Sequence, residues 1–478
     1  MDTSTLRIQN AKQATIFGLP IETLITIFRF AIEYRRDSRN ASKRRPSEIL
    51  SHVCHHFRQV MLDLPEAWAV IDFPLFWRMT DLLPIIAERR ALAKNHPLYI
   101  LVRDGDCEIW SGNVIDAFSR AFDDANIHQL AFHLNHFGMR MIPHQLTLTL
   151  SRPPRSLLLC RPQYQRVSPR FEPSQRKGGH FAIDHCIFYG NYIMEAIPSI
   201  ELVDMTLRFQ GVSDKAKFGW TSFTYRREHL KGGFSPAVSR DLLFLCCPRL
   251  RRINIDGSLV MERAFGNNTP FKPASSLKEI YLYQINDMES YWCLASQRPP
   301  QMPQLRKLGM NLFQLGRLVQ FLSTNPTVEE LSFGPEHHSV STAEMAQILG
   351  MCPNLTKLTF PASWLAMLLP SMIEYEGAID ESRRRLYAVP NLQIDDHSNM
   401  ISIKTFERLV TARIRLSARR DTSVQLSIKF HIGAMVNLSE IGVRERLFPW
   451  MRSRYYALAE VWWTEDVCEM HWSVDAEL

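Results

Sequence analysis

Apolar residues at helical spacing follow a short polar start of the chain. They recur every three or four positions after Pro20, which places them on one face of an α-helix. Proline suits the first helical turn, so we predict an amphipathic helix from about Pro20 to Tyr34, preceded by a disordered tail over residues 1–15. The apolar positions of that face are Ile21, Leu24, Ile25, Phe28 and Ile32.

A second apolar stripe follows the polar, basic run at residues 35–45, which we interpret as a loop between helices. Pro46 and Ser47 offer a break and a capping side chain for a second helix. Pro65 ends that helix and Trp68 begins the next segment, so we expect three short helical elements before residue 72. The second stripe comprises Leu50, Val53, Cys54, Phe57, Val60 and Met61.

Farther along, an L-x-x-L-x-L frame with apolar substitutions recurs in six segments. The last five frames start 27, 28, 23 and 27 residues apart, within the ~20–29 residues of leucine-rich repeats, each a strand plus a returning helix. One such unit cannot bury its apolar face alone, so stacked neighbours supply the core. The six frames start at Ile200, Leu250, Leu277, Leu305, Val328 and Leu355.

The limits of this array follow from weaker signals. An earlier match at Ile127, with alternating runs at 98–102 and 146–150, predicts that the array begins near residue 70. We interpret residues 160–180 and 211–236, which interrupt the pattern with Pro, Gly and charge, as inserted loops. Helices are expected between frames, for example at 315–322 and 342–351.

Beyond Tyr375 the frame fades. Strand-like residues at 423–430 and a tryptophan-rich end follow. A terminal repeat must close an otherwise exposed core, so we expect the region 376–478 to hold C-terminal repeats or a cap. The alternative is a surface for a partner.

The N-terminal segment resembles an F-box of the variety abundant among mushroom-forming fungi. In that family LP opens the first helix, and a VC-x-x-aromatic-R element precedes LPxxW. Phe57 stands where the family usually has Trp, and the loop between the helices is longer and more basic than in compact animal F-boxes. The matching residues are Leu19, Pro20, Glu22, Leu24, Ile27, Phe28, Leu50, Val53, Cys54, Phe57, Arg58, Leu64, Pro65 and Trp68.

The resemblance implies that this segment docks on the Skp adaptor of an SCF ubiquitin ligase. A helical segment of about fifty residues also has too little interior to bury every apolar side chain of its first helix, so some must meet another surface. The candidate adaptor-binding residues are Leu19, Pro20, Ile21, Leu24, Ile27, Phe28, Leu50, Val53, Phe57, Pro65 and Trp68.

The expected fold class is therefore α/β. A small all-helical F-box-like domain at 16–72 precedes an irregular leucine-rich-repeat-like solenoid at 73–375 and the C-terminal region at 376–478. The solenoid is expected to be irregular because the asparagine that usually follows the frame in such repeats is missing or displaced.

Composition and charge narrow the function classes. Hydrophobic residues make up 46% and charged residues 22% of the 478 positions, which are ordinary globular values. The net charge is +7, but the run at 35–45 alone holds six basic residues and one acid. A phosphate-binding domain should carry basic charge along a folded face, so this pattern disfavours nucleic acid as a partner.

No apolar stretch is long enough to span a bilayer. The N-terminal residues lack the features of a secretory signal, and the nine cysteines form no CxxC pair. We therefore expect a chain with reduced thiols that resides in the cytoplasm or the nucleus.

Candidate catalytic and metal-ligating groups are weak. His52, Cys54, His55 and His56 look like metal ligands at first, yet Cys54 lies in the apolar stripe, which favours a packed thiol over a zinc site. The acids at 104–108 follow a strand-like run in a turn context, and the Lys-Gly-Gly segments at 177–179 and 231–233 do not fit a phosphate loop. We expect no metal, no cofactor and no catalytic activity.

The favoured hypothesis is a substrate receptor of an SCF-type ubiquitin ligase. Its partners would be the Skp adaptor, the cullin scaffold and an unknown protein target. The alternative is a repeat scaffold that binds protein or nucleic acid without recruiting a ligase. Binding of either kind would then use the basic run at 35–45 and the tryptophan-rich end.

Overall fold

The computed structural model places the chain in two compact units, Met1–His180 (unit 1) and Phe181–Leu478 (unit 2). It describes residues 19–36, 46–74, 79–103, 113–133, 150–160, 197–203, 218–226, 237–239, 243–244, 247–257, 260–262, 275–283, 299–311, 315–334, 340–365, 367–368, 389–396, 408–409, 424–431, 459–463 and 467–474. The predicted domain boundaries at 72 and 375 stay predictions.

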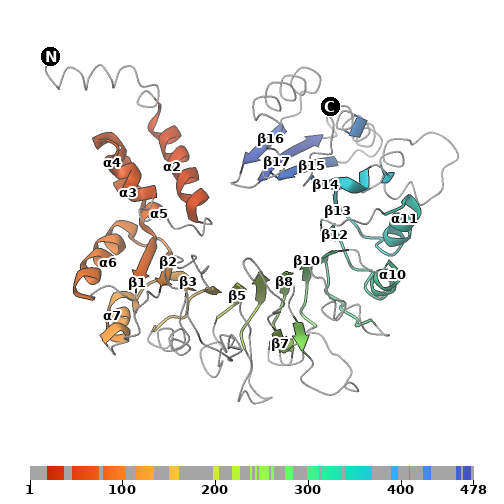
Figure 1. Cartoon of the computed structure of the whole chain (residues 1–478), viewed down its shortest axis with the longest axis horizontal. Coiled ribbons are helices and arrows are strands. Elements are labelled where there is room, and N and C mark those ends of the chain that lie inside the picture. Colours follow the sequence, from red (N-terminus) through yellow and green to blue (C-terminus); the bar gives the residue numbers. More distant parts are fainter. Residues whose placement is uncertain are drawn as a thin grey trace, which may run out of the picture. The chain divides into compact units, whose positions relative to one another are not determined.

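The described residues of unit 1 begin with four helices, drawn in red to orange in Figure 1. These are α2 (Ile21–Arg36), α3 (Pro46–Ser51), α4 (His55–Leu62) and α5 (Pro65–Trp68). Two observations account for their packing. The rings of Phe28 and Phe57 meet edge to face at 4.9 Å, and the indole Nε1 of Trp68 donates a 2.8 Å hydrogen bond to the carbonyl of Met61.

The second predicted helix is divided in two, so the single stripe from Leu50 to Met61 was wrong. The chain leaves the helical conformation at His52–Cys54, where Cys54 has extended backbone angles and its Sγ accepts a hydrogen bond from the Phe57 amide at 3.4 Å. Cys54 therefore caps α4 and is half-buried, instead of packing in a continuous apolar face.

The rest of unit 1 alternates strands and helices. The parallel sheet runs β1 (Val70–Pro74), β2 (Leu98–Arg103), β3 (Ile127–His133) and β4 (Ser156–Cys160), with α6 (Met79–Ala93) and α7 (Asn113–Phe122) in the connections. β1 is the first described strand of this sheet and begins at Val70, close to the residue near which the array is predicted to start. The run at 146–150 lies outside the described residues except for Leu150.

Unit 2 continues the strand pattern in parallel neighbours and ends in antiparallel strands. The parallel strands are β5 (Ser199–Val203), β6 (Ser222–Arg226), β8 (Arg252–Asp256), β10 (Glu279–Tyr283), β11 (Lys307–Met310), β12 (Glu330–Phe333), β13 (Lys357–Pro361), β14 (Asn391–Asp396) and β15 (Val424–His431). β17 (Val467–Val474) pairs antiparallel with β15, and β16 (Ala459–Trp463) pairs antiparallel with β17. A separate two-stranded parallel sheet consists of β7 (Ala237–Ser239) and β9 (Val260–Glu262).

In the described part of unit 2, two helices lie in the connections between β11 and β13. Figure 1 shows α10 (Leu315–Thr324) and α11 (Thr342–Gly350) on the same side of β12 and β13. Both match the predicted helices. A capping box starts α11, since Ser341 Oγ accepts from the Glu344 amide and Glu344 Oε2 accepts from the Ser341 amide. The short helix η4 (Ala362–Trp364) follows β13.

The register of unit 2 follows the apolar frame. The middle position of each frame pairs with the middle position of the next, and all these side chains are buried. This confirms the strands predicted from the frames at 250, 277, 305, 328 and 355. The paired middle positions are Ile253, Ile280, Leu308, Leu331, Leu358 and Leu392.

Three expectations about the frame were wrong. The frame placed at Ile200 begins three residues earlier, because Ile200 itself pairs with Phe223 in β6. Residues 211–236 are not one inserted loop, since they contain β6, whose frame is aromatic: Trp220 and Phe223 are both buried. The frame also does not fade after residue 375, because Leu392 of β14 pairs with Leu358.

The side chains that alternate with the frame residues of unit 2 lie on the opposite side of the strands. We call this side the polar face. It consists of the alternate residues of β5–β14, such as Arg252, Asn254 and Asp256 in β8. Most of these positions are only partly buried.

Candidate functional site

The predicted adaptor-binding residues separate into two groups. Leu24, Phe28, Phe57 and Trp68 are buried inside the helical segment of unit 1. Leu19, Leu50 and Pro65 are partly buried, whereas Pro20, Ile21, Ile27 and Val53 are exposed.

The exposed members share their location with one residue that the sequence did not single out, Ile49. Exposed fractions are 48% for Ile21, 41% for Ile27, 40% for Ile49 and 55% for Val53. Among the described residues, the other large apolar side chains with comparable exposure are Ile85 and Met367. Large exposed apolar side chains are therefore concentrated between residues 21 and 53. We call Pro20, Ile21, Ile27, Ile49 and Val53 the exposed apolar set.

Helical geometry explains the division within α2. Leu24 and Phe28 stand one turn apart on the same face, and that face packs against Phe57. At 3.6 residues per turn Ile27 lies about 100° from Phe28 and about 60° from Leu24 around the helix, so it stands at the edge of this face and stays exposed. α2 also contacts α3, which carries Ile49. Ile21, Ile27 and Ile49 therefore belong to packed helices, and Pro20 and Val53 lie directly beside the ends of these helices.

Two ion pairs fix these helices in place. Arg29 Nε lies 2.6 Å from Glu66 Oε1, which joins α2 to α5. Burial opposes ionisation of Glu66, but the hydrogen bond and the charge of Arg29 outweigh it, so the pKa of Glu66 is lowered. Arg89 of α6 pairs with Glu48 of α3 and is partly buried. The helices that carry Ile21, Ile27 and Ile49 are thus joined to α5 and α6 by ion pairs.

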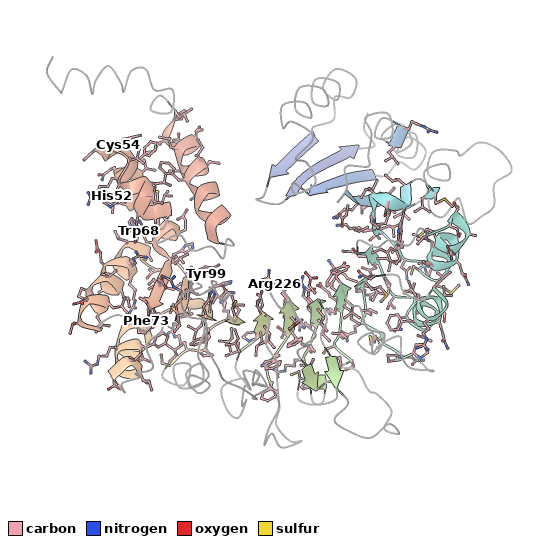
Figure 2. All side chains as sticks on the ribbon, in the orientation of Figure 1. His52, Cys54, Trp68, Phe73, Tyr99 and Arg226 are labelled. Carbon is pink, nitrogen blue, oxygen red and sulfur yellow. The ribbon has the colours of Figure 1, made fainter. Side chains whose placement is uncertain are left out.

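His52 and Cys54 lie in the turn between α3 and α4 (Figure 2), whereas His55 and His56 begin α4. Because the turn interrupts the helix, His52 and His56 do not share one helical face. Within the described ranges, no three His, Cys, Asp or Glu side chains are placed to hold a metal ion. The acids at 104–108 and the Lys-Gly-Gly segments lie outside those ranges.

The polar face of unit 2 carries a row of charges that alternate in sign. The first outward position of each strand, in register from β8 to β13, is Arg252, Glu279, Lys307, Glu330 and Lys357. Lys307 Nζ lies 3.0 Å from Glu330 Oε1, and Arg252 Nε lies 3.4 Å from Glu279 Oε2. These neighbours neutralise one another, so this row is not a basic strip.

Two tyrosines dominate the centre of the polar face. A Cβ added at Gly309 would lie 2.2 Å from Tyr283 Oη and 2.5 Å from Tyr281 Cδ1, so both rings occupy the space above that glycine. The side chain of Tyr283 extends from β10 over Gly309 of β11, and its hydroxyl donates a 2.8 Å hydrogen bond to Ser332 Oγ of β12. Burial raises the pKa of Tyr283, although the Ser332 hydrogen bond opposes the increase.

None of the described helices has the length and apolar character needed to cross a bilayer. No protein-family model matches the chain, and no curated protein matches it.

Proposed function

We propose that this chain is the substrate-receptor subunit of an SCF-type ubiquitin ligase, acting in the cytoplasm or the nucleus. Its F-box-like segment would dock on the Skp adaptor, and its strand-and-helix units would form an irregular leucine-rich-repeat-like solenoid that binds a protein target. The observation that carries the proposal is the exposed apolar set, because it lies on the segment whose motifs resemble an F-box.

The receptor would perform no bond chemistry. Its contribution is proximity: a target held near a ubiquitin-loaded enzyme on the cullin scaffold meets that enzyme at a high effective concentration.

Burial of the exposed apolar set would supply much of the docking energy. At about 25 cal/mol per Å² of apolar surface, covering one half-exposed isoleucine contributes about 1 kcal/mol. Ile21, Ile27, Ile49 and Val53 together would contribute about 4 kcal/mol. The resemblance implies that Leu24 and Phe28 contact the adaptor. Because both side chains are buried, we propose instead that they stabilise the helices that carry the exposed apolar set.

Co-purification of the full chain with the Skp adaptor and the cullin tests this proposal. We expect the wild-type chain to form the complex, and Ile27→Asp combined with Val53→Asp to lose it, because two carboxylates would be buried in an apolar contact. The matched control is Ile85→Asp, which places the same change at an exposed apolar position of α6.

Failure of the wild-type chain to associate with either protein would remove the basis of the proposal. Equal loss of binding in Ile85→Asp and in the double variant would also contradict it, since that result indicates a general effect of added charge.

The alternative of nucleic-acid binding receives less support. Along β8–β13 the described charges of the polar face alternate in sign, whereas phosphate binding calls for clustered basic residues.

A further inference from the structure

Three buried polar atoms without a hydrogen-bond partner lie on the polar face of unit 2. They are Nε of Arg226, Oδ1 of Asp256 and Oδ1 of Asn311. Asn311 is only 7% exposed. Buried polar groups are normally paired, because leaving them unpaired costs folding free energy. A cluster of such groups therefore indicates a ligand that completes the missing bonds.

The strand register brings these residues together from distant parts of the sequence. In the register of the parallel strands, Arg226 of β6 lies opposite Asp256 of β8, and Asp256 lies opposite Tyr283 of β10. Asn311 comes directly after Met310, which pairs with Leu282, so it stands beside Tyr283. We call Arg226, Asp256, Tyr283 and Asn311 the polar cluster. Figure 2 labels Arg226 on its strand.

The polar cluster differs electrostatically from the alternating row of charges beside it. Arg226 forms an ion pair with Glu201, which neutralises its charge while its Nε–H remains without an acceptor. Burial raises the pKa of Asp256, and the charge of Arg226 offsets only part of the increase. Burial raises the pKa of Tyr283, and the charges of Asp395 and Asp256 add to the increase.

We propose that the polar cluster binds an arginine side chain of the protein target. The inference rests on the proposed function, and it names the substrate class of the receptor. A guanidinium is planar, permanently charged and rich in N–H donors, so it can donate to Asp256 Oδ1 and Asn311 Oδ1. Its plane can also stack on the Tyr283 ring.

A peptide ligand could also supply the missing acceptor for the third unpaired atom, Arg226 Nε. Next to an arginine side chain the target has backbone carbonyls, and one of them can accept from Arg226 Nε. A nucleic acid fits poorly, since its phosphates would approach the carboxylates of Asp256 and Asp395. A lysine ammonium fits less well than a guanidinium, because it is a compact point charge that cannot stack as a plane.

A displayed library of random dodecapeptides, selected on the full chain and counter-selected on the Asp256→Asn variant, tests the inference. We expect arginine to be enriched at one position of the Asp256-dependent peptides. Replacing that arginine with citrulline, which keeps the shape and loses the charge, should weaken binding about 10- to 100-fold, as should Asp256→Asn or Asn311→Ala in the protein.

The matched protein control is Asp116→Asn, the same chemical change on the exposed surface of α7, and it should leave peptide binding unchanged. Selection of peptides without arginine, equal binding of the citrulline peptide, or a library that yields no Asp256-dependent peptide would each overturn the inference.

Adaptor co-purification of the same variants separates the two proposals. Asp256→Asn should still bind the Skp adaptor. If the arginine peptides bind as expected but the wild-type chain never associates with the adaptor, the polar cluster stands and the ligase role fails.

Discussion

Alanine substitution at two glycines should have opposite effects on stability. In Gly309→Ala the new Cβ would lie 2.2 Å from Tyr283 Oη, 2.5 Å from Tyr281 Cδ1 and 2.8 Å from Tyr283 Cζ. In Gly316→Ala, within α10, the new Cβ has no neighbour within 4 Å. The chemical change is the same, so the difference between the two variants reports on the packing above β11.

The expected size of each effect follows from these contacts. Overpacking a filled site costs about 1–3 kcal/mol. Moving the Tyr283 ring would also break its hydrogen bond to Ser332, and leaving a buried hydroxyl unpaired costs about 1–3 kcal/mol. Because the two costs are not independent, we expect Gly309→Ala to destabilise unit 2 by about 2–4 kcal/mol. Gly316→Ala should stabilise it by roughly 0.5 kcal/mol, since glycine is unfavourable in helices.

Hydrogen exchange followed by mass spectrometry is the appropriate assay. A chain with two compact units has no single free energy of unfolding, whereas exchange gives the opening free energy of peptides that cover β10–β12. In a background that combines Tyr281→Ala with Tyr283→Ala both clashing rings are removed, so Gly309→Ala should then cost much less. Equal costs in both backgrounds, or a Gly309→Ala effect as mild as that of Gly316→Ala, would refute the packing described here.

Three further predictions concern the core and the titrating groups. Leu24→Ala should destabilise the helical segment by about 2–5 kcal/mol, measured by hydrogen exchange of peptides that cover α2, whereas Ile27→Ala should change it little, because only Leu24 is buried. Asn325→Ala should cost about 2–3 kcal/mol by hydrogen exchange, since buried Asn325 accepts from the Met302 amide at 2.7 Å and donates to the Phe321 carbonyl at 2.9 Å. Burial raises the pKa of Asp256, so its ionisation opposes folding at neutral pH; Asp256→Asn should therefore stabilise unit 2 at pH 7, and the gain should vanish when the pH falls below the ordinary aspartate pKa of 3.8.

The sequence predicted the strands best where the frame is aliphatic. Leu305, Leu308 and Met310 fit the expected spacing and are all buried. β6 was missed because Trp220 and Phe223 occupy the equivalent positions, and aromatic residues between charged stretches of sequence do not resemble the aliphatic pattern. The frame of β5 was misplaced because several apolar residues near Ile200 fit more than one register, and only pairing with β6 decides between them.

The candidate site could be predicted only in part. Helical spacing identified Leu24 and Ile27 as apolar, but which of them is buried depends on where Phe57 packs, and that contact is tertiary. The break at Cys54 was missed because a cysteine is an uncommon helix cap.

The polar cluster escaped notice because its members are far apart in sequence. A usable signal does exist: each member directly follows the last apolar residue of its frame, as Asp256 follows Ile255 and Asn311 follows Met310. An alignment of the frames with one another, including their polar positions, would have placed these residues in one row.

The exposed apolar set and the polar cluster call for different kinds of partner surface. Exposed isoleucines are satisfied by any apolar surface of suitable shape, so their contribution is large and weakly selective. Buried polar atoms such as Asp256 Oδ1 and Asn311 Oδ1 stabilise a complex only when the donors of the partner lie within hydrogen-bonding distance of them. With any other partner they stay unpaired, which lowers its affinity. A receptor that must join a common ligase and also distinguish one target needs both properties. Because the two groups lie in different units of the chain, substitutions in one should leave the binding of the other unchanged.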